Sequence, residues 1–126
     1  MCTVKNNFSL RKYNTFGVDV YAKFYAKFSS IKELLTILKK INTSEVIILG
    51  GGSNILFTKH NYDTVLHNNI NGIYITKENK HHVWVEVGAG EIWHDFVLWS
   101  VKNNFSGVEN LALIPGSVGA SPIQNI

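Results

Sequence analysis

The sequence predicts a mixed α+β fold, in which a small βαβ subdomain is followed by an antiparallel sheet with a packed helix. Apolar residues recur at helical spacing in two segments, and between those segments the apolar period changes to the alternation that is typical of strands. Strand, helix and strand follow one another early in the chain, which favours a βαβ unit. With 45% hydrophobic and 17% charged residues, the composition is that of a globular protein.

In the first half of the chain, we expect a strand, a helix and a second strand. Val18–Phe28 is rich in strand-type residues, and the next segment begins with a capping box in which Ser30 precedes Glu33 by three positions. Val46–Leu49 is an uninterrupted apolar run, which predicts a strand that is buried on both faces. The helix between them should present an apolar stripe that consists of Ile31, Leu34, Leu35, Leu38 and Ile41.

The second half predicts a hairpin and another helix. Between residues 73 and 87, apolar and polar residues alternate on both sides of a polar turn at Asn79–Lys80. A helix is expected over residues 91–103, with an apolar face formed by Ile92, Phe96 and Trp99. The tail that follows is rich in small residues and shows no period.

Several side chains near the second helix have both a chemical and a structural interpretation. We expect the structural one in each case. His94 and Asp95 should be exposed neighbours that do not face each other, and Glu91 should stabilise the helix start through its charge. The tryptophans are expected to lie in the core and not to stack on a flavin; they are Trp84, Trp93 and Trp99.

Composition and charge exclude several classes of function. The net charge of +3 comes from scattered residues, with no basic face for nucleic acid. The five histidines lack the spacing of metal ligands, so no metal site is predicted. Cys2 is the single cysteine, and the first residues lack the apolar segment that a secretory leader needs, so we expect no leader; no apolar run reaches about 18 residues. We therefore expect a cytoplasmic protein without a nucleic-acid or membrane partner.

The stretch VIILGGGSNILF, residues 46–57, predicts a place where the backbone closely approaches a ligand. The glycines at 50–52 permit tight turning, and successive N–H groups in such a loop converge on an anion. Ser53 can add a hydroxyl and Asn54 a side-chain amide. The loop departs from the dinucleotide pattern G-x-G-x-x-G, which needs glycine where Ile55 stands, and we expect a strand after it in place of a helix.

The alternative interpretation of these glycines is a tight hairpin corner that binds nothing. Two further segments of small residues favour a ligand: residues 87–91 (VGAGE) and residues 114–126 (IPGSVGASPIQNI), in which prolines fix the backbone. A dinucleotide needs several such segments, because its pyrophosphate, ribose and ring system must all be approached closely. Together, the segments favour dinucleotide binding over a set of corner turns.

Four motifs resemble a known family in both order and spacing. They are YNTFGVD (residues 13–19), ILGGGSNILF, VGAGEIWHDFVLW and GVENLALIPGSVGASPIQNI. The chain resembles the UDP-N-acetylenolpyruvoylglucosamine reductases, also called UDP-N-acetylmuramate dehydrogenases, over essentially all of its 126 residues. The resemblance implies a PCMH-type FAD-binding fold, shared with vanillyl-alcohol and p-cresol oxidases, with two small lobes near residues 1–57 and 58–126.

By this resemblance, FAD binds non-covalently, because neither glycine-rich loop contains a histidine that could tether the flavin. The pyrophosphate of FAD would lie against Gly50, Gly51, Gly52, Ser53 and Asn54. The segment along the pyrophosphate and flavin would consist of Ile114, Pro115, Gly116, Ser117, Gly119, Ser121, Gln124 and Asn125.

The resemblance also implies a reaction with two half-steps. NADPH reduces FAD, and the flavin then passes hydride to the enolpyruvyl group of a UDP-sugar, giving UDP-N-acetylmuramate for peptidoglycan synthesis. The family's catalytic serine, arginine and glutamate are expected beyond Ile126, so we expect an N-terminal portion of a longer protein, without reductase activity of its own. The alternatives are another flavin oxidoreductase of the same fold and a non-catalytic α/β remnant.

Overall fold

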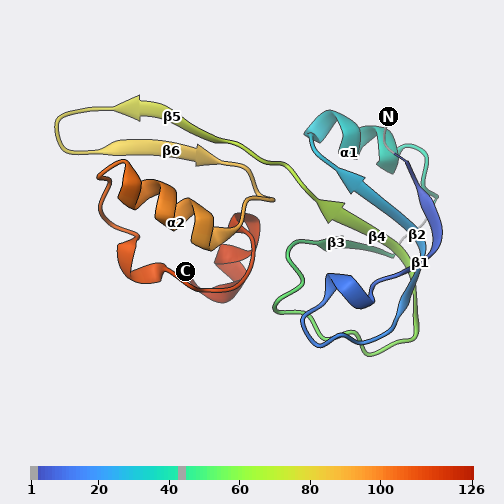
Figure 1. The fold of residues 1–126 in the computed structure, drawn as a ribbon. Coiled ribbons are helices and arrows are strands. Elements are labelled where there is room, and N and C mark those ends of the chain that lie inside the picture. The colour runs from blue at the N-terminus through green and yellow to red at the C-terminus, as the bar shows by residue number, and fades with distance from the viewer. Residues whose placement is uncertain (1–2, 43–44) are drawn as a thin grey trace. The chain divides into compact units, whose positions relative to one another are not determined.

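The computed structural model describes residues 3–42 and 45–126 and contains two compact units, Met1–Asn69 and Ile70–Ile126, here unit 1 and unit 2 (Figure 1). The sequence placed the boundary near residue 57. In the structure, the strand Asn61–Asn68 pairs with strands of unit 1, so the division follows that strand. Cys2 lies outside the described residues.

Among the described residues, unit 1 contains a four-stranded sheet in the order β1-β2-β4-β3. β1 (Lys5–Ser9) is antiparallel to β2 (Tyr21–Phe28), while β4 (Asn61–Asn68) is parallel to β2 on one side and to β3 (Val46–Leu49) on the other. Helix α1 (Ile31–Leu38) connects β2 with β3 (Figure 1). The predicted βαβ order is present, but its two strands are not neighbours, because β4 lies between them.

β4 is an inner strand of this sheet, and sequence reasoning did not identify it. Its residues Thr64, Val65 and Leu66 are at most 1% exposed. Because successive side chains point to opposite faces, this burial means that both faces of β4 are covered. β3 lies at the sheet edge, and its Ile48 is 54% exposed. The prediction that β3 is buried on both faces is therefore wrong.

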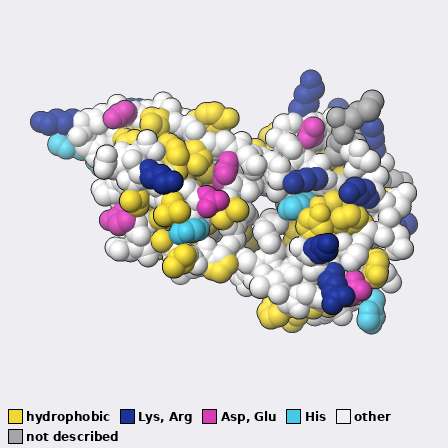
Figure 2. All heavy atoms as spheres, in the orientation of Figure 1, with side chains coloured by type: hydrophobic (Ala, Val, Ile, Leu, Met, Phe, Trp, Pro, Cys, Tyr) yellow, Lys and Arg dark blue, Asp and Glu magenta, His cyan; other side chains and the backbone are white. Residues whose placement is uncertain are grey.

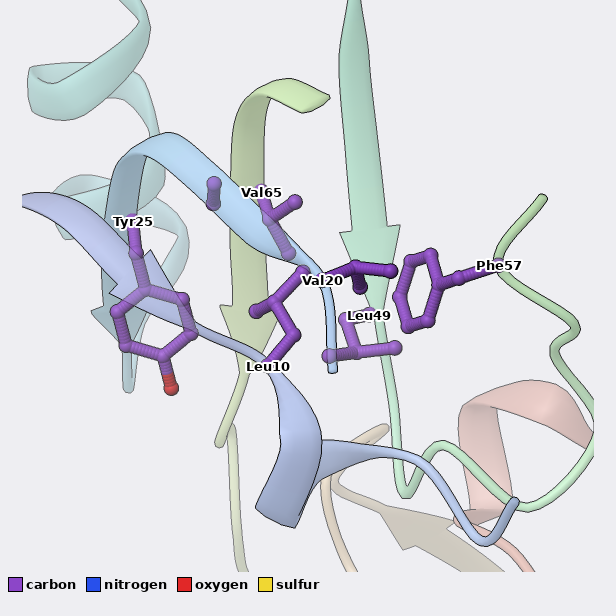
Figure 3. Packing of buried hydrophobic residues seen from close by; sticks show 7 residues of the cluster. Leu10, Val20, Tyr25, Leu49, Phe57 and Val65 are labelled. Carbon is purple, nitrogen blue, oxygen red and sulfur yellow. The ribbon is translucent and has the colours of Figure 1, made fainter. Parts of the chain in front are cut away.

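The core of unit 1 holds both ends of the glycine-rich stretch that follows β3. Leu49, the last residue of β3, is 2% exposed, and Phe57 is 4% exposed. The stretch is therefore anchored in the core at both ends, by Leu49 and by Phe57. The buried cluster in which the two side chains lie consists of Leu10, Val20, Ala22, Tyr25, Leu49, Phe57 and Val65 (Figure 3).

Helix α1 begins at the predicted capping box. The Ser30 hydroxyl accepts a hydrogen bond from the backbone amide of Glu33 over 3.2 Å, and the Glu33 carboxylate accepts one from the amide of Ser29 over 2.8 Å. The carboxylate thus reaches one residue further back than in the usual capping box. The first bond satisfies the amide of Glu33, which has no partner within the first turn of the helix. The second satisfies the amide of Ser29, the residue before the N-cap.

The buried face of α1 differs from the predicted stripe. Ile37 is 2% exposed, whereas three members of the stripe are exposed, with exposures of 61%, 53% and 41% for Ile31, Leu35 and Leu38. The helix has eight residues, or about two turns, and rests on β2. A helix this short presents only a narrow row of side chains to the sheet, so the apolar period alone does not identify that row.

The predicted hairpin is confirmed in unit 2. β5 (Ile73–Glu78) pairs antiparallel with β6 (Val83–Val87), with an irregularity between Ile75 and Lys77. The turn is closed by Asn79, whose side-chain oxygen accepts hydrogen bonds over 2.8 Å from the amides of His81 and His82, two and three residues later.

Helix α2 (Trp93–Lys102) starts later than predicted, and its buried face is displaced. Ile92 precedes the helix in an extended conformation, pairs with Ser117 across an isolated bridge and is 56% exposed. The residues of α2 that are buried are Trp93, Val97 and Ser100. Two 3₁₀ helices follow, η2 (Glu109–Leu111) and η3 (Val118–Gln124), which the sequence did not predict.

The tryptophans have different surroundings. Trp93 is 7% exposed, as predicted for a core residue, and Trp99 is partly buried. Trp84 is 43% exposed on β6, and the ammonium group of Lys77 lies 4.8 Å from its ring centroid. The core prediction is therefore wrong for Trp84, because the hairpin leaves one of its faces to solvent.

The packing of α1 predicts different costs for two neighbouring truncations. Ile37→Ala should lower the free energy of unfolding by about 2–5 kcal/mol, because it leaves a cavity in a buried site. Leu35→Ala, the matched control on the same helix, should cost less than about 1 kcal/mol. Urea unfolding followed by circular dichroism measures both values. Equal losses would contradict the assignment of the buried face.

Candidate functional site

Residues 50–54 form a loop at the carboxyl end of β3, between the buried side chains of Leu49 and Phe57. No helix follows the loop directly, in agreement with its departure from the G-x-G-x-x-G pattern. The strand expected after Asn54 is not formed, since residues 55–58 have no regular structure. Phe57 is buried in the core, although its backbone does not pair with a strand.

Gly52 is the most constrained residue of this loop. Its φ is +72°, and a Cβ atom at this position would lie 2.0 Å from the backbone oxygen of Tyr13. The carbonyl of Gly52 accepts a hydrogen bond from the amide of Thr15 over 3.0 Å. The residue must be glycine for two reasons: its backbone is left-handed, and there is no space for a side chain. The segment around Tyr13 contacts the loop directly and fixes its position.

The segment around Tyr13 is in turn closed by a buried asparagine. Asn14, 8% exposed, donates from its side-chain nitrogen to the carbonyls of Leu10 and Val18 over 2.9 and 3.0 Å. Its side-chain oxygen accepts from the amide of Val18 over 3.0 Å. Asn14 and Thr15 belong to the YNTFG motif, and sequence reasoning gave them no role beyond the resemblance.

The loop offers backbone amides to a ligand. In the part of the chain that the structure describes, the amides of Gly51, Gly52, Ser53 and Asn54 donate no hydrogen bond. Gly52 is a buried residue, and a buried N–H group without a partner is rare in proteins. Amides in a turn that contains a left-handed residue can converge on one anion. The residues present therefore fit a pyrophosphate.

Next to the loop support lies a cluster of rings on one face of the sheet. The ring of Tyr13 meets that of His67 edge-on at 5.3 Å between centroids, and the hydroxyl of Tyr25 lies 2.9 Å from His67 Nδ1. Burial, followed by hydrogen bonding and interaction with Tyr13, raises the pKa of Tyr25 above its ordinary value. Burial, followed by repulsion from Lys27, lowers the pKa of His67. Both groups are therefore uncharged at neutral pH, and their hydrogen bond joins a neutral phenol to a neutral imidazole.

The surface of unit 1 carries many basic side chains. Figure 2 shows Lys and Arg side chains around a hydrophobic patch on this unit. Positive side chains on a protein surface raise the local concentration of anions. The surface is thus compatible with an anionic ligand, although it does not select one.

In unit 2, the other two segments of small residues lie side by side. Gly119 donates to the carbonyl of Ala89 over 3.0 Å, and Val118 donates to that of Glu91 over 2.8 Å. A Cβ atom on Gly119 would lie 2.7 Å from Cβ of Ala89. The amide of Trp93 also donates to the carbonyl of Gly116 over 3.0 Å. The structure therefore brings residues 87–91 and 116–121 together, backbone against backbone.

The remaining predicted site residues lie in the segment 114–125 of unit 2. Ser117 is 6% exposed, while Pro115 lies on the surface. Gly116 has a φ of +125°, and Asn125 ends η3 with a left-handed φ of 58°. The others are partly exposed or, for Gly119, exposed; they are Ile114, Gly119, Ser121 and Gln124.

Two acidic residues have partners that the sequence did not indicate. The Glu91 carboxylate accepts a hydrogen bond from the amide of Gly72 over 2.6 Å, so it joins the hairpin to the turn before α2. The sequence predicted that the charge of Glu91 stabilises the start of α2. In the structure, α2 begins two residues later, and the carboxylate binds the Gly72 amide. The carboxylate of Glu109 accepts from Gly107, and hydrogen bonds from its own and neighbouring amides lower its pKa.

One hollow of unit 2 is separate from the predicted residues. It has a volume of about 500 Å³ and lies between the hairpin turn, Glu78–Val83, and residues 104–106 after α2. None of the predicted site residues lines it. Within residues 3–42 and 45–126, the structure contains no cluster of three or more potential metal-ligating side chains and no helix long and apolar enough to cross a membrane.

Comparison with known proteins decides the family. The family described as FAD binding domain matches residues 22–126, which is most of the chain. The chain belongs to this family. Membership in this FAD-binding family confirms the predicted FAD-binding character of the fold.

Similar proteins of known name are reductases. The chain is 52% identical to a UDP-N-acetylenolpyruvoylglucosamine reductase of Flavobacterium johnsoniae, over 98% of this chain and 36% of that protein. It is 44% identical to the reductase of the same name from Bacteroides fragilis, over 98% of this chain and 37% of that protein. These matches confirm the family resemblance, and the chain spans little more than a third of the relatives' length.

A solved structure confirms the fold. The chain is similar to UDP-N-acetylenolpyruvylglucosamine reductase from Thermus caldophilus, with a TM-score of 0.70 over 96% of this chain and 41% of that one. The sequence identity is 24%, so this likeness concerns the fold alone. The predicted α+β class of the FAD-binding fold is thereby confirmed.

The close approach at Gly52 predicts a specific cost for an added methyl group. Gly52→Ala should lower the free energy of unfolding by about 2–5 kcal/mol, because it combines left-handed strain with a clash against Tyr13. Gly17→Ala is the control: φ there is +64°, but nothing lies within 4 Å of the added atom. Its cost should be about 1–2 kcal/mol. Urea unfolding measures both, and equal costs would contradict a steric role for Tyr13.

The lowered pKa of His67 predicts a pH-dependent stability of unit 1. The folded pKa lies below the unfolded value of 6.5, so the folded state binds fewer protons between the two values. Stability should therefore rise as the pH increases through that window and fall as His67 becomes charged. His67→Gln should flatten this part of the profile. Amide hydrogen exchange of β4 against pH is the measurement, and identical profiles for both proteins would refute the prediction.

Proposed function

We propose that the chain is the FAD-binding portion of an NADPH-dependent reductase that converts UDP-N-acetyl-3-O-(1-carboxyvinyl)-glucosamine into UDP-N-acetylmuramate. Support comes from the 52% identity with a named reductase over 98% of the chain. The observation that carries FAD binding is the loop of residues 50–54. There, the amide of the buried Gly52 donates to no described residue, and the backbone allows no side chain.

In this proposal, the loop holds the pyrophosphate of FAD and the segment in unit 2 follows the pyrophosphate and flavin. Hydrogen bonds from backbone amides to a charged oxygen contribute about 1.5–3 kcal/mol each. No helix starts directly after the loop, so no helix dipole adds to this attraction. The proposed contacts are Gly50, Gly51, Gly52, Ser53, Asn54, Ile114, Pro115, Gly116, Ser117, Gly119, Ser121, Gln124 and Asn125.

The chemistry that bound FAD supplies is hydride transfer from NADPH to the enolpyruvyl group. The residues of this chain bind and orient the cofactor non-covalently. The serine acid and the arginine and glutamate that stabilise the enolate are expected beyond Ile126, and the chain spans little more than a third of the relatives' length. The partners are small molecules, the UDP-sugar and NADPH, and the proposed location is the cytoplasm. We expect the chain by itself to show no reductase activity.

FAD titration of the 126-residue chain tests the proposal. Flavin fluorescence should change in a saturable way. Gly51→Val should weaken binding about tenfold or more, because a branched side chain among the amides removes at least one hydrogen bond to the pyrophosphate. A flat titration of the wild-type chain would instead support a remnant that binds nothing.

Thr58→Val is the matched control for this substitution. It introduces the same side chain a few residues after the loop, at an exposed position whose backbone amide donates to the hydroxyl of Tyr62 over 2.9 Å. The substitution keeps that amide. The variant should bind FAD within about twofold of the wild type. Equal weakening by both variants would show that valine acts through the fold and not through the loop amides.

A further inference from the structure

A strained leucine directly precedes the proposed FAD segment of unit 2. Leu113 has a φ of +64°, a left-handed conformation that costs a residue with a side chain appreciable energy. Its side chain is 78% exposed, so burial of that side chain does not hold the conformation. Such strain persists only where surrounding contacts over-determine the backbone, and it concentrates at functional sites.

The contacts that hold this backbone come from the first turn of α2. The amide of Leu113 donates to Nδ1 of His94 over 3.1 Å, and the indole nitrogen of Trp93 donates to the carbonyl of Leu111 over 2.8 Å. On the far side, the backbone amide of Trp93 donates to the carbonyl of Gly116 over 3.0 Å. The chain is therefore anchored to two adjacent α2 residues both before and after Ile114 and Pro115.

We propose that His94 is a positioning residue, which holds Leu113 in its left-handed conformation and thereby sets the path of residues 114–116 toward FAD. The inference rests on the proposed function. His94 acts through the backbone: its Nδ1 is the acceptor, so its other ring nitrogen carries the hydrogen. In the described ranges, the ring of His94 makes no aromatic contact, which leaves the bond to Leu113 as its specific interaction.

Two substitutions can separate the hydrogen bond of His94 from the backbone strain at Leu113. The side-chain oxygen of asparagine is separated from Cα by as many bonds as Nδ1 of histidine, so His94→Asn can keep the acceptor. Glycine adopts positive φ without the cost that a side chain imposes. Leu113→Gly therefore removes the need for an external contact that enforces the conformation.

The test is a double-mutant cycle on FAD affinity, read from flavin fluorescence. His94→Ala should weaken FAD binding about fivefold, the equivalent of one neutral hydrogen bond. His94→Asn should restore binding to within about twofold of the wild type. In the Leu113→Gly background, His94→Ala should have an effect of less than about twofold. Leu98→Ala, which truncates an exposed side chain of α2, is the control and should leave affinity unchanged.

Two outcomes would overturn the inference: the same loss from His94→Ala in both backgrounds, or a loss in His94→Asn as large as in His94→Ala. A wild-type chain that fails to bind FAD would refute the proposed function instead. In that case, the same cycle is read from the free energy of unfolding, followed by tryptophan fluorescence, since all three tryptophans lie in unit 2. Additive effects there would overturn the action of His94 through Leu113, and coupling would support it.

Discussion

The contact between the Tyr13 carbonyl and Gly52 determines the shape of the glycine-rich loop in unit 1. It leaves no volume for a Cβ atom, and the adjacent Thr15 amide binds the Gly52 carbonyl at the same place. Leu49 and Phe57 anchor the two ends of the loop in the core. A loop that is fixed at both ends and by the contact with Tyr13 and Thr15 presents its amides in one arrangement. A ligand that binds them loses little free energy to ordering the protein.

Unit 2 uses the same principle with other elements. Gly119 lies against Ala89 so closely that neither backbone can move away without breaking the hydrogen bond between them. The first turn of α2 adds contacts from its backbone, from an indole and from an imidazole to the segment that runs from η2 to η3. In unit 2, several backbone hydrogen bonds hold the segments with small side chains, whereas the loop of residues 50–54 is held through the carbonyl of Gly52 and by its two buried ends. Irregular segments that are supported in this way can bind a ligand without the dynamics of an ordinary surface loop.

Caps and tight turns were predicted from the sequence, whereas the order of the strands in the sheet of unit 1 was not. The capping box at Ser30 and the polar turn at Asn79 involve residues within four positions of each other, so the sequence contains the whole interaction. The burial of β4 depends on β2 and β3, which precede it by many residues, and no local period indicates it. For the candidate site, the glycines identified the loop. The supporting residues, Thr15 and His94, could not be assigned because each acts on a distant backbone group.

The position of β4 between β2 and β3 has a consequence for how the protein acquires its structure as it leaves the ribosome. The first two parallel strands of unit 1 do not pair with each other, since each pairs with β4. A nascent chain that has emerged only through the glycine-rich loop can form the β1–β2 ribbon and α1, but its β3 still has no partner. Parallel pairing must therefore wait until residues 61–68 are synthesised, and until then the unpaired backbone edges of β2 and β3 remain open to misassembly.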